Sequence, residues 1–161
     1  MGNRVYGISA LYGGQTIGGI TSHAQRNVIS ANGNYGLNLG AFDSANGGMV
    51  VANNFIGTTA NGLQPLGNVT GIYLGTPDSL VGGSESLASN VISGNEHWGL
   101  RLVGQQQTVL GNRIGVGADG TTAVPNGWDG IYSTASDGSQ IGGLGSGEAT
   151  ISAHNGASGI A

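Results

Sequence analysis

The sequence predicts an all-β protein, a right-handed parallel β-helix in which about five rungs of roughly 30 residues stack into a solenoid. Two observations predict this fold. A short phrase, glycine followed by alternating apolar residues, returns at intervals of 28 to 35 residues, and such a period is typical of solenoid repeats. Glycine makes up 34 of the 161 residues and charged residues only 7%, so the fold must use glycine at many fixed backbone positions.

The first strand of each rung begins at the recurring glycine. Residues one and three positions after the glycine are mostly apolar and should point inward, because successive side chains in a strand alternate between two faces. The first inward column is expected to contain Ile8, Leu37, Ile72, Leu100, Ile131 and Ile160. The residues between the inward positions should form an outward column of Ser9, Asn38, Tyr73, Arg101 and Tyr132.

Two more short strands complete each rung, and the rungs alternate between two types. In the first, third and fifth rungs these strands are expected around 17–19 and 27–30, 81–83 and 90–93, and 141–143 and 149–152. In the second and fourth rungs they are expected at 49–51 and 54–57, and at 108–110 and 112–115. Such short strands cannot bury a face alone, so each should stack on its homologue at roughly 4.7 to 4.9 Å.

Asparagine marks the corners between these strands. It precedes the third strand at Asn27 and Asn90, and it follows that strand at Asn32, Asn95 and Asn155. An asparagine side chain tolerates the left-handed backbone conformation and can hydrogen-bond along the stack to the next rung. These asparagines are therefore expected to be structural.

Composition and the chain ends suggest the domain organisation and exclude several partners. A net charge of −4 with only four basic residues disfavours nucleic acid and anionic membrane surfaces. No apolar run approaches a membrane span, and the absence of cysteine excludes disulfides and thiolate metal sites. We expect residues 1–161 to form a single domain and to be a fragment of a longer array, because neither end shows a segment that would cap an open sheet edge.

Several phrases resemble a known family. Ile17-Gly18-Gly19, the segment 26–32, the segment 54–58 and their second copies resemble the pectin-lyase-like parallel β-helix repeats of large bacterial secreted and cell-surface proteins. The resemblance covers nearly the whole chain. It implies a bacterial extracellular or cell-surface location and a spacer or adhesive role. The same architecture is also similar to that of pectin lyases, polysaccharide epimerases and phage tailspikes.

Residues that could carry catalysis or bind a metal do not gather in this sequence. The eight acidic residues fall mostly in turns and lysine is absent, whereas a lyase or hydrolase needs clustered carboxylates and a base or metal. Asp119 is the best calcium candidate, but the matching turn has Asn61 in place of a second carboxylate. His23, His97 and His154 lie in separate turns. We expect no catalytic residue, no metal and no cofactor.

The tyrosines and tryptophans gather along the outer face of the first strands. The candidate ligand-binding residues are Asn38, Tyr73, Trp98, Arg101 and Tyr132. Tyr73, Arg101 and Tyr132 should stack in successive rungs, an arrangement suited to cation–π contacts. Exposed aromatic rings beside asparagine and arginine can hold a sugar chain. The alternative is that the rings stack on one another and shield the strand edge.

Three functions follow from these observations. The favoured one is a non-enzymatic structural or adhesive module of a large extracellular protein, which associates with itself through its open solenoid ends, either by end-to-end stacking or as a dimer. The second is a carbohydrate-binding module that uses the aromatic face. The third is part of a polysaccharide lyase or epimerase, and scattered carboxylates disfavour it.

Overall fold

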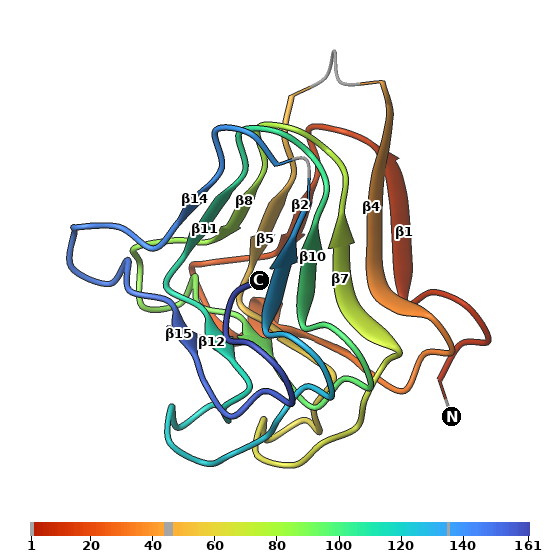
Figure 1. Ribbon diagram of the computed structural model, residues 1–161, viewed down its shortest axis with the longest axis vertical. Coiled ribbons are helices and arrows are strands. Elements are labelled where there is room, and N and C mark those ends of the chain that lie inside the picture. The colour runs from red at the N-terminus through yellow and green to blue at the C-terminus, as the bar shows by residue number, and fades with distance from the viewer. Residues whose placement is uncertain (1, 44–46, 135) are drawn as a thin grey trace.

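The chain folds as a parallel β-helix whose three sheets enclose one interior, as a computed structural model shows (Figure 1). The structure describes residues 2–43, 47–134 and 136–161, with the backbone alone for residues 41–43. Each of five rungs contributes one strand to each sheet. The parallel β-helix with three short strands per rung is therefore confirmed.

Every strand pairs in parallel with its counterparts in the neighbouring rungs. The first sheet contains β1 (Ile8–Tyr12), β4 (Tyr35–Asp43), β7 (Thr70–Leu74), β10 (Leu100–Leu102) and β13 (Ile131–Ser133). The second sheet contains β2 (Thr16–Gly18), β5 (Val50–Ala52), β8 (Leu80–Gly82), β11 (Thr108–Leu110) and β14 (Gln140–Ile141). The third sheet contains β3 (Asn27–Ile29), β6 (Asn54–Ile56), β9 (Val91–Ile92), β12 (Arg113–Ile114) and β15 (Ile151–Ser152).

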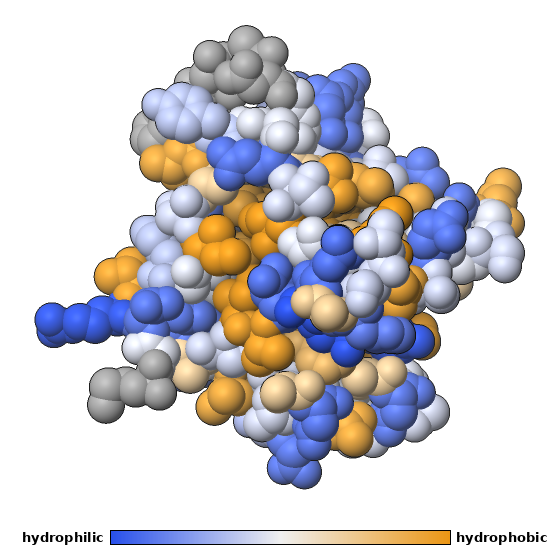
Figure 2. Space-filling model, turned by 180° about the vertical axis from the view of Figure 1, so that it is seen from behind, coloured by the Kyte–Doolittle hydropathy of each residue, from blue (hydrophilic) through white to orange (hydrophobic). Residues whose placement is uncertain are grey.

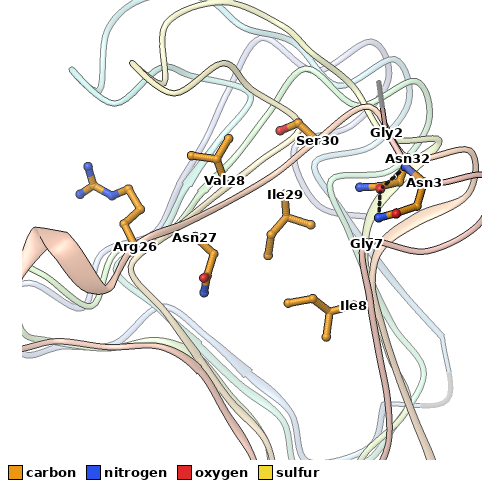
Figure 3. Close-up of a pocket in the computed structure, with 10 residues that line it drawn as sticks. All are labelled: Gly2, Asn3, Gly7, Ile8, Arg26, Asn27, Val28, Ile29, Ser30 and Asn32. Carbon is orange, nitrogen blue, oxygen red and sulfur yellow. Dashed lines mark hydrogen bonds between the residues drawn. The ribbon is translucent and has the colours of Figure 1, made fainter.

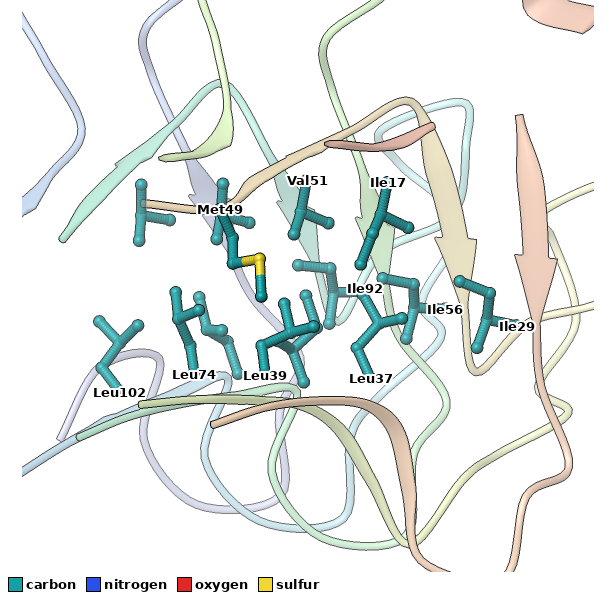
Figure 4. Packing of buried hydrophobic residues seen from close by; sticks show 14 of the residues in the cluster. Ile17, Ile29, Leu37, Leu39, Met49, Val51, Ile56, Leu74, Ile92 and Leu102 are labelled. Atoms are coloured by element: carbon teal, nitrogen blue, oxygen red, sulfur yellow. The ribbon is translucent and has the colours of Figure 1, made fainter. Parts of the chain in front are cut away.

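The register of the first sheet confirms the predicted inward column. Leu100 pairs with Ile72 on one side and with Ile131 on the other, and an isolated bridge joins Ile131 to Ile160. The middle members of the column are completely buried. Figure 4 shows the inward side chains of the three sheets facing one another across a filled interior. Burial of each aliphatic side chain contributes about 1.5 to 3 kcal/mol, so this interior is the main source of stability.

The two rung types differ in the corner that carries a long loop. In the first, third and fifth rungs the long loop joins the second sheet to the third, at 19–26, 83–90 and 142–150. In the second and fourth rungs it joins the third sheet to the first, at 57–69 and 115–130. Homologous strands lie roughly 4.8 Å apart. Because the two rung types alternate, two long loops at the same corner are always separated by a rung that has a tight turn there.

Helix is nearly absent from the described residues, as the sequence predicts. The one helix there is a single 3₁₀ turn, η1 (His23–Gln25), in the first long loop. Among the described residues, no helix has the length and apolar character that crossing a bilayer requires.

Each tight corner consists of a left-handed residue followed by an asparagine. The left-handed residues, with φ between 59° and 74°, are Ala31, Asn53, Gly94, Gly111 and His154. The asparagines that follow them are Asn32, Asn54, Asn95, Asn112 and Asn155. The corner asparagines that the sequence singles out have no positive φ. At Asn32, Asn95 and Asn155 the left-handed residue is thus the one before the asparagine, and the predicted hydrogen bonding of asparagine along the stack is confirmed.

Two ladders of asparagine side chains run along the corners. The first ladder lies between the third and first sheets and contains Asn3, Asn32, Asn68, Asn95, Asn126 and Asn155. The second lies between the second and third sheets and contains Asn27, Asn54, Asn90 and Asn112. In both, each Nδ2 donates to Oδ1 of the next asparagine at 2.7 to 3.1 Å. Donors therefore point toward the last rung and acceptors toward the first.

Candidate functional site

The outer face of the first sheet brings most of the predicted ligand-binding residues together. Asn38 pairs with Tyr73, Tyr73 with Arg101, and Arg101 with Tyr132 in the strand register. Trp98 lies just before β10 and leans over the same face, because its ring stacks on Tyr132 with centroids 5.1 Å apart. We name this row the aromatic column; it contains Tyr6, Tyr35, Tyr73, Arg101, Trp98 and Tyr132.

The tyrosines of the first three rungs stack face to face. The rings of Tyr6 and Tyr35 have centroids 5.7 Å apart and planes inclined by only 3°. Tyr73 continues this stack above Tyr35, with centroids 5.3 Å apart and planes at 25°. Both faces of Tyr35 are thus covered by other rings. Such pairs stabilise a fold by about 0.5 to 1.5 kcal/mol beyond burial of their area.

Arg101 continues the column from the tyrosines to Trp98. Its guanidinium carbon lies 5.7 Å from the ring centroid of Tyr73 and 5.3 Å from that of Trp98, within the range of a cation–π contact. The sequence predicts that Arg101 contacts the rings of Tyr73 and Tyr132, whereas in the structure its second aromatic partner is Trp98. The Nε atom of Arg101 is buried and has no hydrogen-bond partner among the described residues. The aromatic contacts are therefore its main local stabilisation.

This stacking limits what the column can recognise. A sugar ring binds an aromatic side chain through the free negative face of the π system. Here the faces of Tyr35 are covered by Tyr6 and Tyr73, and those of Trp98 are approached by Arg101 and Tyr132. The inner rings of the column are thus approached on both faces, and the arrangement favours mutual stacking over a flat sugar-binding platform.

Asn38 belongs to the outward column, where Tyr73 is its register partner in the next rung. Its Nδ2 donates to the Ser9 hydroxyl of the first rung at 3.2 Å. The structure therefore places this predicted site residue beside the aromatic column and uses its amide between rungs.

The sequence did not reveal a second aromatic cluster next to the column. The His97 imidazole stacks on the Trp128 indole with centroids 3.8 Å apart and planes at 10°. Trp128 also meets Trp98 edge to face at 4.6 Å, and Trp98 Nε1 donates to Asp129 Oδ2 at 3.2 Å. His97 and Trp128 both stand two residues before the recurring glycine, and this shared position is the signal that could have paired them. Trp128 remains 42% exposed.

The Asp119 turn is closed by its own hydrogen bonds. The carboxylate accepts from the Thr122 hydroxyl at 2.6 Å and from the backbone N–H groups of Thr121 and Thr122. The Thr122 hydroxyl, followed by these backbone donors, lowers the pKa of Asp119 to about 2. In the matching turn, Asn61 Oδ1 accepts from Leu63 N–H and the Thr59 hydroxyl. Both side chains therefore stabilise a turn in the same way.

Titratable groups remain scattered on the fold. Within the described part of the chain, no three His, Cys, Asp or Glu side chains approach closely enough to hold a metal ion. His23 lies in η1, His97 lies in the aromatic cluster and His154 occupies a tight corner.

Comparison with protein-family models, with curated proteins and with solved structures gives no match for this chain.

Proposed function

We propose that the chain is a non-enzymatic structural and adhesive module of a large bacterial secreted or cell-surface protein. One observation carries the proposal: the side chains best suited to recognition contact one another across rungs. Rings of the aromatic column cover each other's faces, and the ladder asparagines donate to one another. Interactions of this kind join each rung to its neighbours, which makes a solenoid suitable as a spacer.

The absence of catalysis is tested directly with polysaccharides. The purified protein is incubated with pectin, alginate and related polymers, with and without calcium, and the release of unsaturated or reducing ends is measured. We expect no release, because a β-helix lyase needs a base or metal beside its carboxylates. Turnover that the Arg101→Ala substitution abolishes would replace this proposal with an enzyme whose site lies on the aromatic column.

Carbohydrate binding is the second candidate, and Trp128 is the observation that favours it. Its indole is 42% exposed at the end of the column, and Tyr132 beside it stacks on Trp98. The ligand would be an uncharged or weakly charged glycan across Tyr73, Arg101 and Tyr132, so salt should change its affinity little.

A glycan array separates the two functions. A structural module should bind no glycan, whereas a binding module should lose its ligand when Tyr73 and Tyr132 are both changed to Ala. Tyr35→Ala is the matched control, because both faces of the Tyr35 ring are already covered by tyrosines. Equal loss in the control and the double variant would indicate damage to the stack and not to a binding site.

A further inference from the structure

A pocket lies on the side of the solenoid, at the corner between the second and third sheets. It has a volume of about 240 Å³ and lies between the long loops 83–90 and 142–150, at the tight corner of the fourth rung that contains Gly111. The loop 142–150 projects from one edge of the molecule in Figure 1 and from the opposite edge in Figure 2, the view from behind. The pocket therefore arises from the alternation of rung types, which sets a tight corner between two long loops.

The first two rungs show what fills the equivalent place between the loops 19–26 and 83–90. There the Asn53 Nδ2 donates to the carbonyls of Gly19 and Ser22 at 2.8 and 3.0 Å. The Asn53 Oδ1 accepts from Arg26 Nε at 3.1 Å. Figure 3 shows the Arg26 side chain pointing outward, away from the interior, and its guanidinium carbon lies 4.2 Å from the centroid of the Phe55 ring. This guanidinium thus has both an oxygen acceptor and an aromatic partner.

Three replacements change this place in the third and fourth rungs. Gly111 stands where Asn53 stands in the second rung, because each directly precedes an asparagine of the same ladder. By the same relation, Ser89 stands where the first rung has its arginine. Arg113 takes the position of Phe55, since both are register partners of the same residue of β9. The arginine has thus moved from the loop to the strand, and the carboxamide that would accept from it is missing.

Arg113 lines the pocket with an incomplete set of hydrogen bonds. Its Nη1 donates to the Ser89 hydroxyl at 2.9 Å, while its Nε is buried and has no partner among the described residues. A Cβ atom on Gly120 would lie 3.4 Å from this Nε, so the loop 115–130 covers that side of the guanidinium. A guanidinium has five N–H donors. Arg113 is therefore held in place and can still donate to an acceptor in the pocket.

The charges around the pocket decide which acceptor suits it. Arg113 and Glu85 are the charged residues that line it, and Glu85 is exposed to solvent. The hydroxyls of Ser84 and Ser86 also line the pocket and can donate to an oxygen. Water and salt screen the exposed Glu85 charge, but its repulsion grows with the charge of a ligand. The pocket therefore suits an anion with one charge better than phosphate or sulfate with two.

We infer that this pocket binds a small organic monocarboxylate. One carboxylate oxygen accepts from Arg113, as the Asn53 Oδ1 accepts from Arg26 in the first two rungs. Hydrogen bonds between a guanidinium and a carboxylate are among the strong ones, because both groups are charged. The inference goes beyond the proposed function, since it places a ligand between two loops, on residues that do not belong to the aromatic column.

The test titrates the full chain with sodium acetate at neutral pH and constant ionic strength, and follows the backbone amide resonances. We expect saturable shifts in the segments 84–89 and 111–113. Arg113→Gln should weaken acetate binding about tenfold or more, the effect of one lost charge-assisted hydrogen bond. Arg26→Gln is the matched control. It makes the same charge change three rungs away, roughly 14 Å, which exceeds the Debye length of about 8 Å, and should alter the affinity by no more than about twofold.

Two further measurements keep the test decisive. Acetamide has the shape of acetate without its charge and should bind the unmodified protein about tenfold more weakly, which gives an answer even where the Arg113 variant fails to fold. Glu85→Gln removes the repelling charge and should tighten acetate binding about twofold. Unmoved amides in the two segments, equal affinities of the two arginine variants, or acetamide binding as tight as that of acetate overturns the inference. So does weaker acetate binding by Glu85→Gln.

Discussion

Single asparagines connect the rungs through groups that no other side chain supplies in the same shape. Asn95 is buried, and its Oδ1 accepts from both the N–H and the Nδ2 of Asn68. Its own N–H and Nδ2 then donate to Asn126 Oδ1. Aspartate would keep the acceptor, lose the donor and bury a charge. Asparagine therefore combines one acceptor and two donors, which is what a repeating ladder requires.

Removal of a central ladder side chain should destabilise the fold strongly. We expect Asn95→Ala to lower the free energy of unfolding by about 2 to 4 kcal/mol, because it leaves buried donors of Asn68 unpaired. Asn3→Ala is the control, since Asn3 is exposed at the end of the same ladder, and should cost about 1 kcal/mol or less. Urea denaturation of both variants measures the difference. Equal losses would show that the ladder is not a buried network.

The Asp119 turn predicts a local dependence of stability on pH. The folded-state pKa of Asp119, about 2, lies below its ordinary value of 3.8. A carboxyl group with a lowered pKa stabilises the fold at pH values above the ordinary pKa, and this contribution disappears as the pH falls through the folded pKa. From pH 4 to pH 2 the wild type should therefore lose more stability than Asp119→Asn. Thermal unfolding of both proteins across this range is the measurement, and parallel curves would contradict the assigned hydrogen bonds.

At the scale of elements, the corners separate the two rung types. Long loops at 57–69 and 115–130 lie on either side of the tight corner at Gly94, and the Gly94 N–H donates to the Val124 carbonyl of the second loop at 3.1 Å. The corner has room for backbone alone. A Cβ on Gly94 would lie 2.6 Å from the Gly57 carbonyl oxygen and 2.9 Å from the Pro65 Cα.

The corner at Gly94 supplies a matched pair of substitutions. Gly94→Ala should lower the free energy of unfolding by about 2 kcal/mol or more, since a left-handed alanine costs about 1 to 2 kcal/mol before any clash. Ala31 holds the same left-handed conformation in the first rung, with φ 61°. Ala31→Gly should change stability by no more than about 1 kcal/mol, because relief of strain and loss of chain entropy oppose each other. Chemical denaturation tests both, and a neutral Gly94→Ala would mean that the corner can open.

The strands were predictable from sequence because their pattern is local. Alternation within β7 or β10 identifies the buried residues, and the repeat identifies their partners in the next rung. The contacts of the aromatic column were less predictable. Arg101 lies against Trp98 as well as Tyr73, and His97 lies on Trp128, because side-chain torsions decide where a ring goes once its Cα position is set. Repeat position indicates proximity and leaves the stacking partner open.

At the scale of the whole molecule, the continuous interior should make unfolding cooperative. Leu100 is completely buried between Ile72 and Ile131. A charge at this position has no partner, so Leu100→Asp should destabilise by about 4 kcal/mol or more and abolish the cooperative transition. Leu66→Asp is the control, because Leu66 is 45% exposed in a loop. Circular dichroism during heating should show a β-type spectrum and a sharp melt for the control, and a similar melt for both variants would invalidate the register.

The alternation of long and tight corners also sets the unit by which such an array can change its length. Insertion or deletion of one rung would bring two rungs of the same type together and place their long loops on adjacent levels. Insertion or deletion of two consecutive rungs keeps the alternation, and it also keeps the donor-to-acceptor direction of both ladders. We therefore expect the array to tolerate changes of length in pairs of turns. The structural unit of this solenoid is therefore the two-turn block, whose long loops lie at two separate corners.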